Sequence, residues 1–230
     1  MKQIVTTGIV LSRTDFGEAD RILTILTPDQ GRIRVIAKGV RKIKSKLAGG
    51  IELFSVSQIT FIQGKSEIYT LVSTRLEQHF GHITTDIERT MFGYEVLKRL
   101  NRSVEDNAER EYFTLLSHTL IVLDQLDVPQ PAIELWLSAQ LLKLAGHSPN
   151  LTTDNSGQKL SQEQTYGFDL DTMAFVVKPE GSYDANHIKL IRLAFGLESP
   201  LGLRQVKDIS KVLPASLQLI KLMNSQFIHS

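Results

Sequence analysis

Residues 30–50 of this 230-residue chain read QGRIRVIAKGVRKIKSKLAGG. This stretch holds seven basic residues and no acidic one, whereas the whole chain carries a formal net charge of +1. The rest of the chain therefore sums to −6, so a slightly acidic protein gathers its positive charge in one place. The basic residues of the stretch are Arg32, Arg34, Lys38, Arg41, Lys42, Lys44 and Lys46. Such a concentration of charge favours contact with a polyanion.

The first half of the stretch has the alternation of a half-buried strand, because successive side chains of a strand point to opposite faces. In a strand over 32–38, the face that enters a core would carry Ile33, Val35 and Ala37. The opposite face would carry Arg32, Arg34, Ile36 and Lys38. From 39 to 50 the alternation breaks, and a basic segment with glycines at both ends predicts a mobile loop beside this strand.

Strand-like segments lie on both sides of the basic stretch, joined by turn-forming residues. Together with 32–38 they make five expected strands within about 80 residues, over 3–13, 21–27, 32–38, 56–62 and 67–76. Five short strands with one longer insert predict a small barrel of the oligonucleotide-binding (OB-fold) type over residues 1–80. This module carries 12 basic and 7 acidic residues, and residues 81–230 carry 14 basic and 18 acidic.

From about residue 84 the hydrophobic period changes from 2 to 3.6, which predicts a helical domain over 81–230. Thr85 and Glu88 predict a capping box for the first helix, and Asp106 predicts the cap of the second. One face of the first helix would carry Ile87, Met91, Tyr94 and Leu97.

Residues 133–144 are apolar almost all round, which predicts the central helix of a bundle. The segment 147–181 is polar and reads as an irregular insert with one short strand over 174–177. The predicted fold class is therefore α+β, with a barrel domain followed by a helical domain.

The composition excludes several classes of protein. The chain has no cysteine, so it can form neither disulfides nor thiolate metal sites, and we expect a soluble, cytoplasmic protein without a membrane span. No phosphate-binding loop, nucleophile elbow or zinc-protease helix is present, so we expect neither an enzyme nor a cofactor. His79 and His82 lack a clear metal-binding partner in sequence, and Asp169 with Asp171 favours a turn over a cation site.

A strand face and a loop carrying these cations could follow a phosphate backbone and gain affinity by releasing counterions. The same charges also fit a solvated surface. Position on an OB-type barrel favours nucleic acid. Aromatic residues lie outside the basic run, which predicts backbone-directed, sequence-independent recognition with little base stacking. They are Phe16, Phe54, Phe61 and Tyr69.

Motifs within about residues 8–55 resemble those of the bacterial recombination mediator family RecO. In order along the chain they are Arg13 with Gly17-Glu18-Ala19-Asp20-Arg21, Thr27-Pro28-Asp29-Gln30-Gly31-Arg32, Ala37-Lys38-Gly39-Val40-Arg41 and Lys46-Leu47-Ala48-Gly49, followed by Phe54. The rest of the chain fits the family's layout of a barrel followed by helices.

This resemblance implies a non-enzymatic DNA-repair protein of the RecF pathway type. Such proteins bind single- and double-stranded DNA, anneal complementary strands, and help to load recombinase onto DNA coated with single-strand-binding protein. The implied partners are RecR and single-strand-binding protein, and the implied location is the cytoplasm, at the nucleoid. The residues that match the family's basic barrel surface are Arg13, Arg32, Arg34, Lys38, Arg41, Lys42, Lys44 and Lys46.

The chain departs from the family in one respect. Many members carry a four-cysteine zinc module in the region of 147–181, where this chain has Asp154 and Gly157 near the place of one cysteine pair. We therefore expect no structural zinc. Two other functions stay open from the residues: a protein-interaction scaffold built on the helical domain, and an RNA-binding OB-fold protein.

Overall fold

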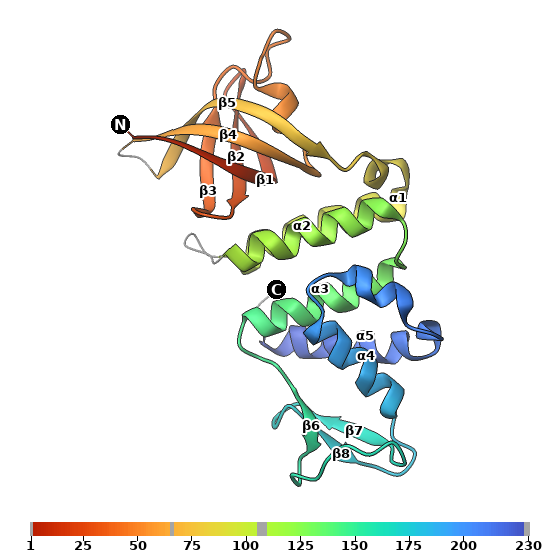
Figure 1. Ribbon diagram of the computed structural model, residues 1–230. Coiled ribbons are helices and arrows are strands. Elements are labelled where there is room, and N and C mark those ends of the chain that lie inside the picture. Colours follow the sequence, from red (N-terminus) through yellow and green to blue (C-terminus); the bar gives the residue numbers. More distant parts are fainter. Residues whose placement is uncertain (1, 65–66, 105–109, 228–230) are drawn as a thin grey trace. The chain divides into compact units, whose positions relative to one another are not determined.

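The structure is a computed structural model that describes residues 2–64, 67–104 and 110–227. The chain divides into two compact units, Met1–Asp124 and Gln125–Ser230 (Figure 1). The boundary expected at residue 80 marks the change from strands to helices, whereas the compact units divide later, after two helices. The predicted cap Asp106 lies outside the described residues.

The first unit opens with a closed five-stranded barrel whose strands follow the order β1-β2-β3-β5-β4 (Figure 1). The long first strand closes the ring, because its first half pairs with β4 and its second half pairs with β2. β3 and β5 pair in parallel, and the other pairs are antiparallel. The strands are β1 (Lys2–Phe16), β2 (Asp20–Thr27), β3 (Gly31–Ala37), β4 (Ser55–Gln63) and β5 (Ile68–His79). The predicted OB-fold-like barrel is confirmed.

The barrel core follows from the alternation of the strands. Ile33, Val35 and Ala37 of β3 are buried in it, as predicted. They pack with apolar residues of the neighbouring strands, among them Leu23 and Ile25 of β2. The opposite side chains of β3 therefore face out of the barrel.

Two helices complete the first unit, α1 (Ile87–Ser103) and α2 (Arg110–Gln125), after the short 3-10 helix η2 (Gly81–Thr85). Asp86 caps α1, accepting a 2.8 Å hydrogen bond from the backbone N–H of Arg89. The predicted capping box of Thr85 and Glu88 is therefore wrong. The Thr85 hydroxyl instead donates to the carbonyl of His82, because the 3-10 turn extends through Thr85 and the helix begins two residues later.

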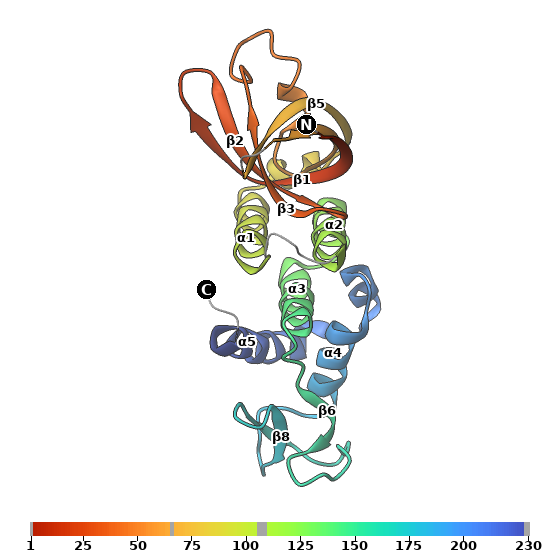
Figure 2. The ribbon, with the colours of Figure 1, turned by 90° about the vertical axis from the view of Figure 1, so that its left-hand side faces the viewer.

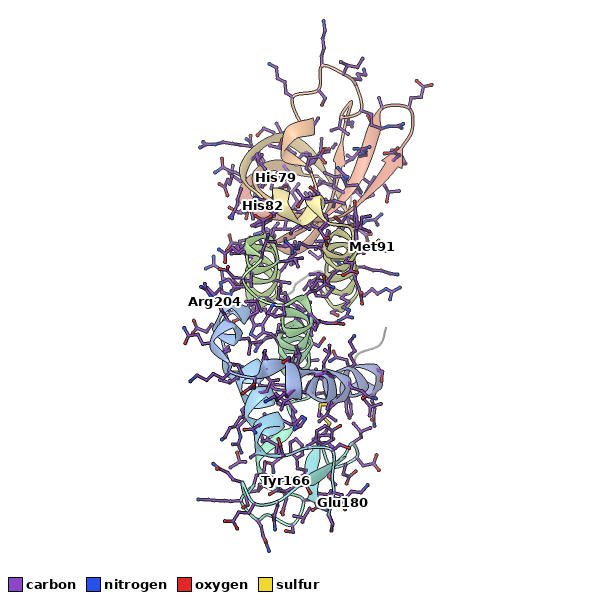
Figure 3. The ribbon with its side chains drawn as sticks, turned by 90° about the vertical axis from the view of Figure 1, so that its right-hand side faces the viewer. His79, His82, Met91, Tyr166, Glu180 and Arg204 are labelled. Atoms are coloured by element: carbon purple, nitrogen blue, oxygen red, sulfur yellow. The ribbon has the colours of Figure 1, made fainter. Side chains whose placement is uncertain are left out.

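Of the four residues predicted to form the apolar face of α1, only one is buried. Leu97 is buried, but Ile87, Met91 and Tyr94 are exposed. Met91 is labelled in Figure 3. The buried residues of α1 are Phe92, Gly93, Val96, Leu97 and Leu100. At Gly93 a Cβ atom would lie 2.8 Å from the ring of Phe54, so the helix packs too closely on the barrel for a side chain there.

The second unit is a helical bundle around α3 (Gln130–Leu144), which packs against α4 (Ala185–Gly196) and α5 (Ile209–Phe227). The Trp136 side chain is buried, and its indole N–H donates to the carbonyl of Leu197 at 2.9 Å. The central position predicted for residues 133–144 is confirmed. A 3-10 helix, η3 (Pro200–Gln205), connects α4 to α5.

The insert is more regular than its sequence predicted. It forms a three-stranded sheet in the order β6-β8-β7, with β6 (Asn150–Asp154), β7 (Tyr166–Asp169) and β8 (Ala174–Val177). Only the last strand was expected. Tyr166, shown in Figure 3, is buried and packs edge-to-face on Phe175. Within the described ranges, no helix is long and apolar enough to cross a lipid bilayer.

Candidate nucleic-acid interface

The cationic face of β3 follows from the strand's alternation. Arg34 lies in the middle of the strand and Lys38 directly follows its end, and both side chains are exposed. Since β3 rises about 3.3 Å per residue, the two side chains lie roughly 13 Å apart along it. The C-terminal end of β3 pairs with the start of β2, where Ala37 lies opposite Arg21. The face thus leads toward the loop that follows.

Arg32 occupies the same strand face but has a structural contact. Its Nη1 donates a 2.7 Å hydrogen bond to the carbonyl oxygen of Asn101, in the last turn of α1. The carbonyls of a helix's last turn lack partners within the helix, so a guanidinium there satisfies one of them and complements the helix dipole. Arg32 therefore ties α1 to the barrel, a role that its sequence position did not reveal.

Both ends of the basic loop are fixed to the barrel. At its start, the Asp20 carboxylate accepts from the backbone N–H of Gly39 at 2.7 Å, and the N–H of Arg41 donates to the carbonyl of Ala19 at 2.9 Å. Gly39 has a φ of +65°, a left-handed conformation that glycine adopts without strain. Near its end, the Leu47 carbonyl accepts a 3.1 Å hydrogen bond from the hydroxyl of Thr74.

These contacts place the basic loop beside the turn between β1 and β2, and Figure 2 shows both at the same end of the barrel. The predicted loop is present, but it is anchored at both ends. Its projecting part is 42–46. One turn leads into this part, closed by the Lys42 N–H donating to the Gly39 carbonyl at 3.1 Å, and a second turn follows, closed by the Ser45 N–H donating to the Lys42 carbonyl at 2.9 Å.

The cations of the projecting part are exposed and available to a ligand. Among the described residues, five of the eight predicted contact residues have side chains that form no hydrogen bond or ion pair. They are Arg34, Lys38, Lys42, Lys44 and Lys46. We call these five residues the open cations.

Besides Arg32, the remaining two predicted contact residues, Arg13 and Arg41, take part in ion pairs. Arg13 Nη1 lies 2.8 Å from Glu52 Oε2, and Arg41 Nε lies 3.5 Å from Asp15 Oδ2. Arg21 donates to the other oxygen of Asp15 at 2.7 Å. This hydrogen bond, with the charges of Arg41 and Arg13, holds the pKa of Asp15 below its usual value. The three arginines thus keep the carboxylate ionised and offset its charge.

Arg21 was not among the predicted contact residues. Its ion pair could have been recognised from the hairpin between β1 and β2, because the register that pairs Phe16 with Asp20 also places Asp15 opposite Arg21. Cross-strand neighbours on one face come close enough for an ion pair.

The barrel's aromatic residues are mostly unavailable to a ligand. Phe54 and Phe61 are buried, and the half-buried Tyr69 stacks on Phe61 with ring centroids 5.3 Å apart. Phe16, at the β1–β2 turn, is exposed.

The insert does not provide the ligands of a zinc module. The Asp154 carboxylate is buried and accepts hydrogen bonds from the hydroxyl and N–H of Ser156 and from the N–H of Gln158, at 2.7–3.0 Å. These hydrogen bonds, that of the Ser156 hydroxyl foremost, lower the pKa of Asp154. The turn that follows β8 is closed by a hydrogen bond from the Gly181 N–H to the carbonyl of Lys178. Hydrogen bonds thus hold the two turns, and the residues present do not fit a zinc ion.

The histidines noted in the sequence do not form a metal centre either. His82 Nδ1 lies 3.3 Å from a carboxylate oxygen of Asp124, and Figure 3 shows His82 near His79. In the part of the chain that the structure describes, no three His, Asp or Glu side chains gather as metal ligands would. Asp169 accepts hydrogen bonds from Asp171 and Thr172, the pattern of the predicted turn.

The fold and this surface define a protein with an OB-fold-like barrel that carries a cationic strand and loop, followed in the sequence by a helical unit. Comparison with known sequences shows which proteins the chain is similar to. Residues 1–80 match the family described as "Recombination protein O N terminal".

Several curated proteins, each named DNA repair protein RecO, are similar to the chain. A relative from Dehalococcoides mccartyi strain 195 is 36% identical over 163 residues, which cover 70% of this chain and 64% of the relative. One from Roseiflexus sp. RS-1 is 39% identical over 64% of this chain and 51% of its own length. One from Alkaliphilus metalliredigens is 27% identical over 91% of this chain and 85% of its own.

Residues 1–80 of the chain thus match the RecO N-terminal domain, and the chain is similar to curated proteins named DNA repair protein RecO over 64–91% of its length. It spans between about half and two-thirds of the length of the first two of these relatives.

Proposed function

We propose that the chain binds single- and double-stranded DNA through the open cations and promotes the annealing of complementary strands. The observation that carries the proposal is the set of five exposed cations without a partner among the described residues, on one strand and the adjoining loop. A surface whose charges were already paired would release few counterions on binding DNA, whereas each open cation can displace one.

Annealing requires two polyanions to approach each other, and their phosphate repulsion opposes this. A strand face and a projecting loop offer two cationic surfaces at one end of the barrel, so each could hold one DNA strand. The protein would then lower the electrostatic cost of pairing without making or breaking a covalent bond, in keeping with a non-enzymatic role.

We further propose the partners implied by the family resemblance, RecR and single-strand-binding protein, and a role in loading recombinase onto coated DNA. The similarity to proteins named DNA repair protein RecO supports this proposal. Association with the nucleoid would follow from DNA binding.

The experiment that tests the proposed function is binding of labelled single strands and duplexes to the full chain. We expect the variant Arg41→Ala, Lys42→Ala, Lys44→Ala and Lys46→Ala to bind both DNAs more weakly, with a flatter dependence on salt. Wild-type affinity and salt dependence in this variant would refute the loop as the DNA site.

The two other functions predict results that differ from these. An RNA-binding protein would prefer RNA over single-stranded DNA of the same sequence in direct competition. A scaffold whose barrel only positions the helical residues would keep its repair activity after the loop cations are removed. We expect neither result, because the open cations lie on the barrel and not on the helical unit, and the proteins similar to the chain are named as DNA repair proteins.

A further inference from the structure

Ile43 projects from the tip of the basic loop. Its side chain is 104% exposed, compared with 82% for Ile87, the next of the exposed large apolar side chains. It is the second residue of the turn closed by the Ser45 N–H and the Lys42 carbonyl. The central residues of a turn stand farthest from the strands that it joins, so the barrel offers Ile43 no surface to pack on.

Turn formation does not explain an isoleucine here. Turns favour Gly, Pro, Asn, Asp and Ser, each for a conformational or hydrogen-bonding reason that isoleucine lacks. Nor does solubility explain it, since an exposed apolar side chain on a loop gains nothing from water. The direct neighbours, Lys42 and Lys44, are open cations, so the sequence presents an apolar group between two charged ones.

This arrangement matches the chemistry of DNA, in which apolar base faces lie between two rows of phosphates. Proteins that bend or open a duplex insert apolar side chains such as isoleucine between base steps while cations hold the backbone. The loop is also suited to carry such a side chain, because its start is fixed by Asp20 and Ala19 and its end by Thr74. A β-branched side chain adds stiffness at its own χ1.

We propose that Ile43 is an apolar wedge that enters between neighbouring bases when Lys42 and Lys44 hold the adjacent phosphates. The inference rests on the proposed DNA binding and extends it from the backbone to the bases. A wedge unstacks bases without reading their identity. It would act best at mismatched, unpaired or frayed positions, where unstacking costs least, and it would leave separated bases open to a complementary strand.

The test compares Ile43→Ala with Ile87→Ala in the full chain. Both variants truncate an exposed isoleucine of the first unit to the same extent, and both leave the charge unchanged. The probe is a duplex with one mismatch beside a 2-aminopurine, whose fluorescence rises when it loses its stacking neighbour. We expect the wild-type protein and Ile87→Ala to raise the fluorescence, and Ile43→Ala to lose most of the rise.

Affinity for the mismatched duplex should fall about tenfold in Ile43→Ala, the loss expected when most of an isoleucine's burial is removed. Its salt dependence should stay at the wild-type value, because no phosphate contact is removed. An Ile43→Ala variant that matches Ile87→Ala in fluorescence and affinity would overturn the wedge.

Two further outcomes are distinguishable from these. If removal of the loop cations leaves DNA affinity unchanged, the proposed function fails and not only the wedge. If Ile43→Ala weakens binding to phosphatidylglycerol vesicles but leaves the 2-aminopurine signal intact, the tip is a membrane contact and the wedge is overturned.

Discussion

The open cations of the loop tip allow a quantitative prediction about DNA binding. Changing Lys42, Lys44 and Lys46 together to Ala removes three charges whose side chains form no hydrogen bond or ion pair within the described residues. The hydrogen bonds that anchor the loop involve other groups, or the backbone alone at Lys42. We therefore expect the variant to fold like the wild-type protein and to differ from it in its electrostatics.

The magnitude follows from counterion release. Each phosphate contact contributes about 0.9 to the slope of the logarithm of the binding constant against the logarithm of the salt concentration on duplex DNA. Three lost contacts should flatten the slope by about 2.7. Between 50 and 200 mM salt, the wild-type protein should then lose roughly 40-fold more affinity than the variant loses.

The assay is fluorescence anisotropy of a labelled duplex over this salt range. A matched control removes three exposed lysines of the second unit, Lys178, Lys189 and Lys207. A second variant, Arg34→Ala with Lys38→Ala, measures the strand face, for which we expect a change of about 1.8. Equal slopes for the loop variant and the control would refute the assignment of the loop.

Three further predictions concern the stability of the units. Arg32→Ala should cost about 1.5 kcal/mol of unfolding free energy in urea, because the Asn101 carbonyl loses its charged donor, whereas Arg34→Ala should be neutral; equal costs would contradict this. Phe54→Ala should cost about 3–5 kcal/mol in the same measurement, and a loss below 1 kcal/mol would mean that α1 does not pack on the barrel. Asp154→Asn should lower the Tm at pH 7. Hydrogen bonds hold the folded pKa of Asp154 below its usual 3.8, so the stability that its carboxylate contributes is complete above that pH and is lost as the pH falls through the folded value. The difference in Tm between the wild-type protein and Asp154→Asn should therefore shrink as the pH is lowered. A difference in Tm that does not depend on pH would contradict this.

The barrel and the cationic strand could be predicted from the sequence because their signals are local. Alternation over 32–38 determines which side chains enter the core once a sheet forms, and Ile33, Val35 and Ala37 are buried accordingly. Residues 133–144 are likewise apolar almost all round, so the sequence leaves no broad polar face for solvent and predicts a central helix.

The pairing of the cations could not be predicted in this way. Arg32 meets Asn101 across 69 residues of sequence, and Arg13 meets Glu52 across 39. Only the closure of the barrel and the docking of α1 bring these partners together. The sequence therefore indicates how much charge is gathered, and the fold decides how much of it is free to bind.

Helix α1 shows a second limit, since periodicity alone cannot say which stripe is buried. Ile87, Met91 and Tyr94 share a face with regular spacing, yet the barrel surface around Phe54 receives the neighbouring face instead. The fit is determined by Gly93, whose missing side chain lets the helix approach. Tyr94 contacts Phe54 edge-to-face from the border of the exposed stripe.

The insert shows a third limit. Its sequence is polar, which predicted irregular structure, and it lacks the cysteines of the family's zinc module. The structure keeps a small sheet there, and buried hydrogen bonds at Asp154 close the turn where many members of the family would bind metal. Short polar strands of this kind give little hydrophobic periodicity to detect.

Site-specific cross-linking tests most directly the claim that the cationic end of the barrel is the DNA interface. The chain has no cysteine, so single-cysteine variants can be labelled with a photo-crosslinker at one position only. Lys44→Cys places the label on the loop, and Lys189→Cys places it on α4 as the control. We predict strong cross-linking of single-stranded and duplex DNA from the loop position and little from α4. Equal or stronger cross-linking from α4 would contradict the account.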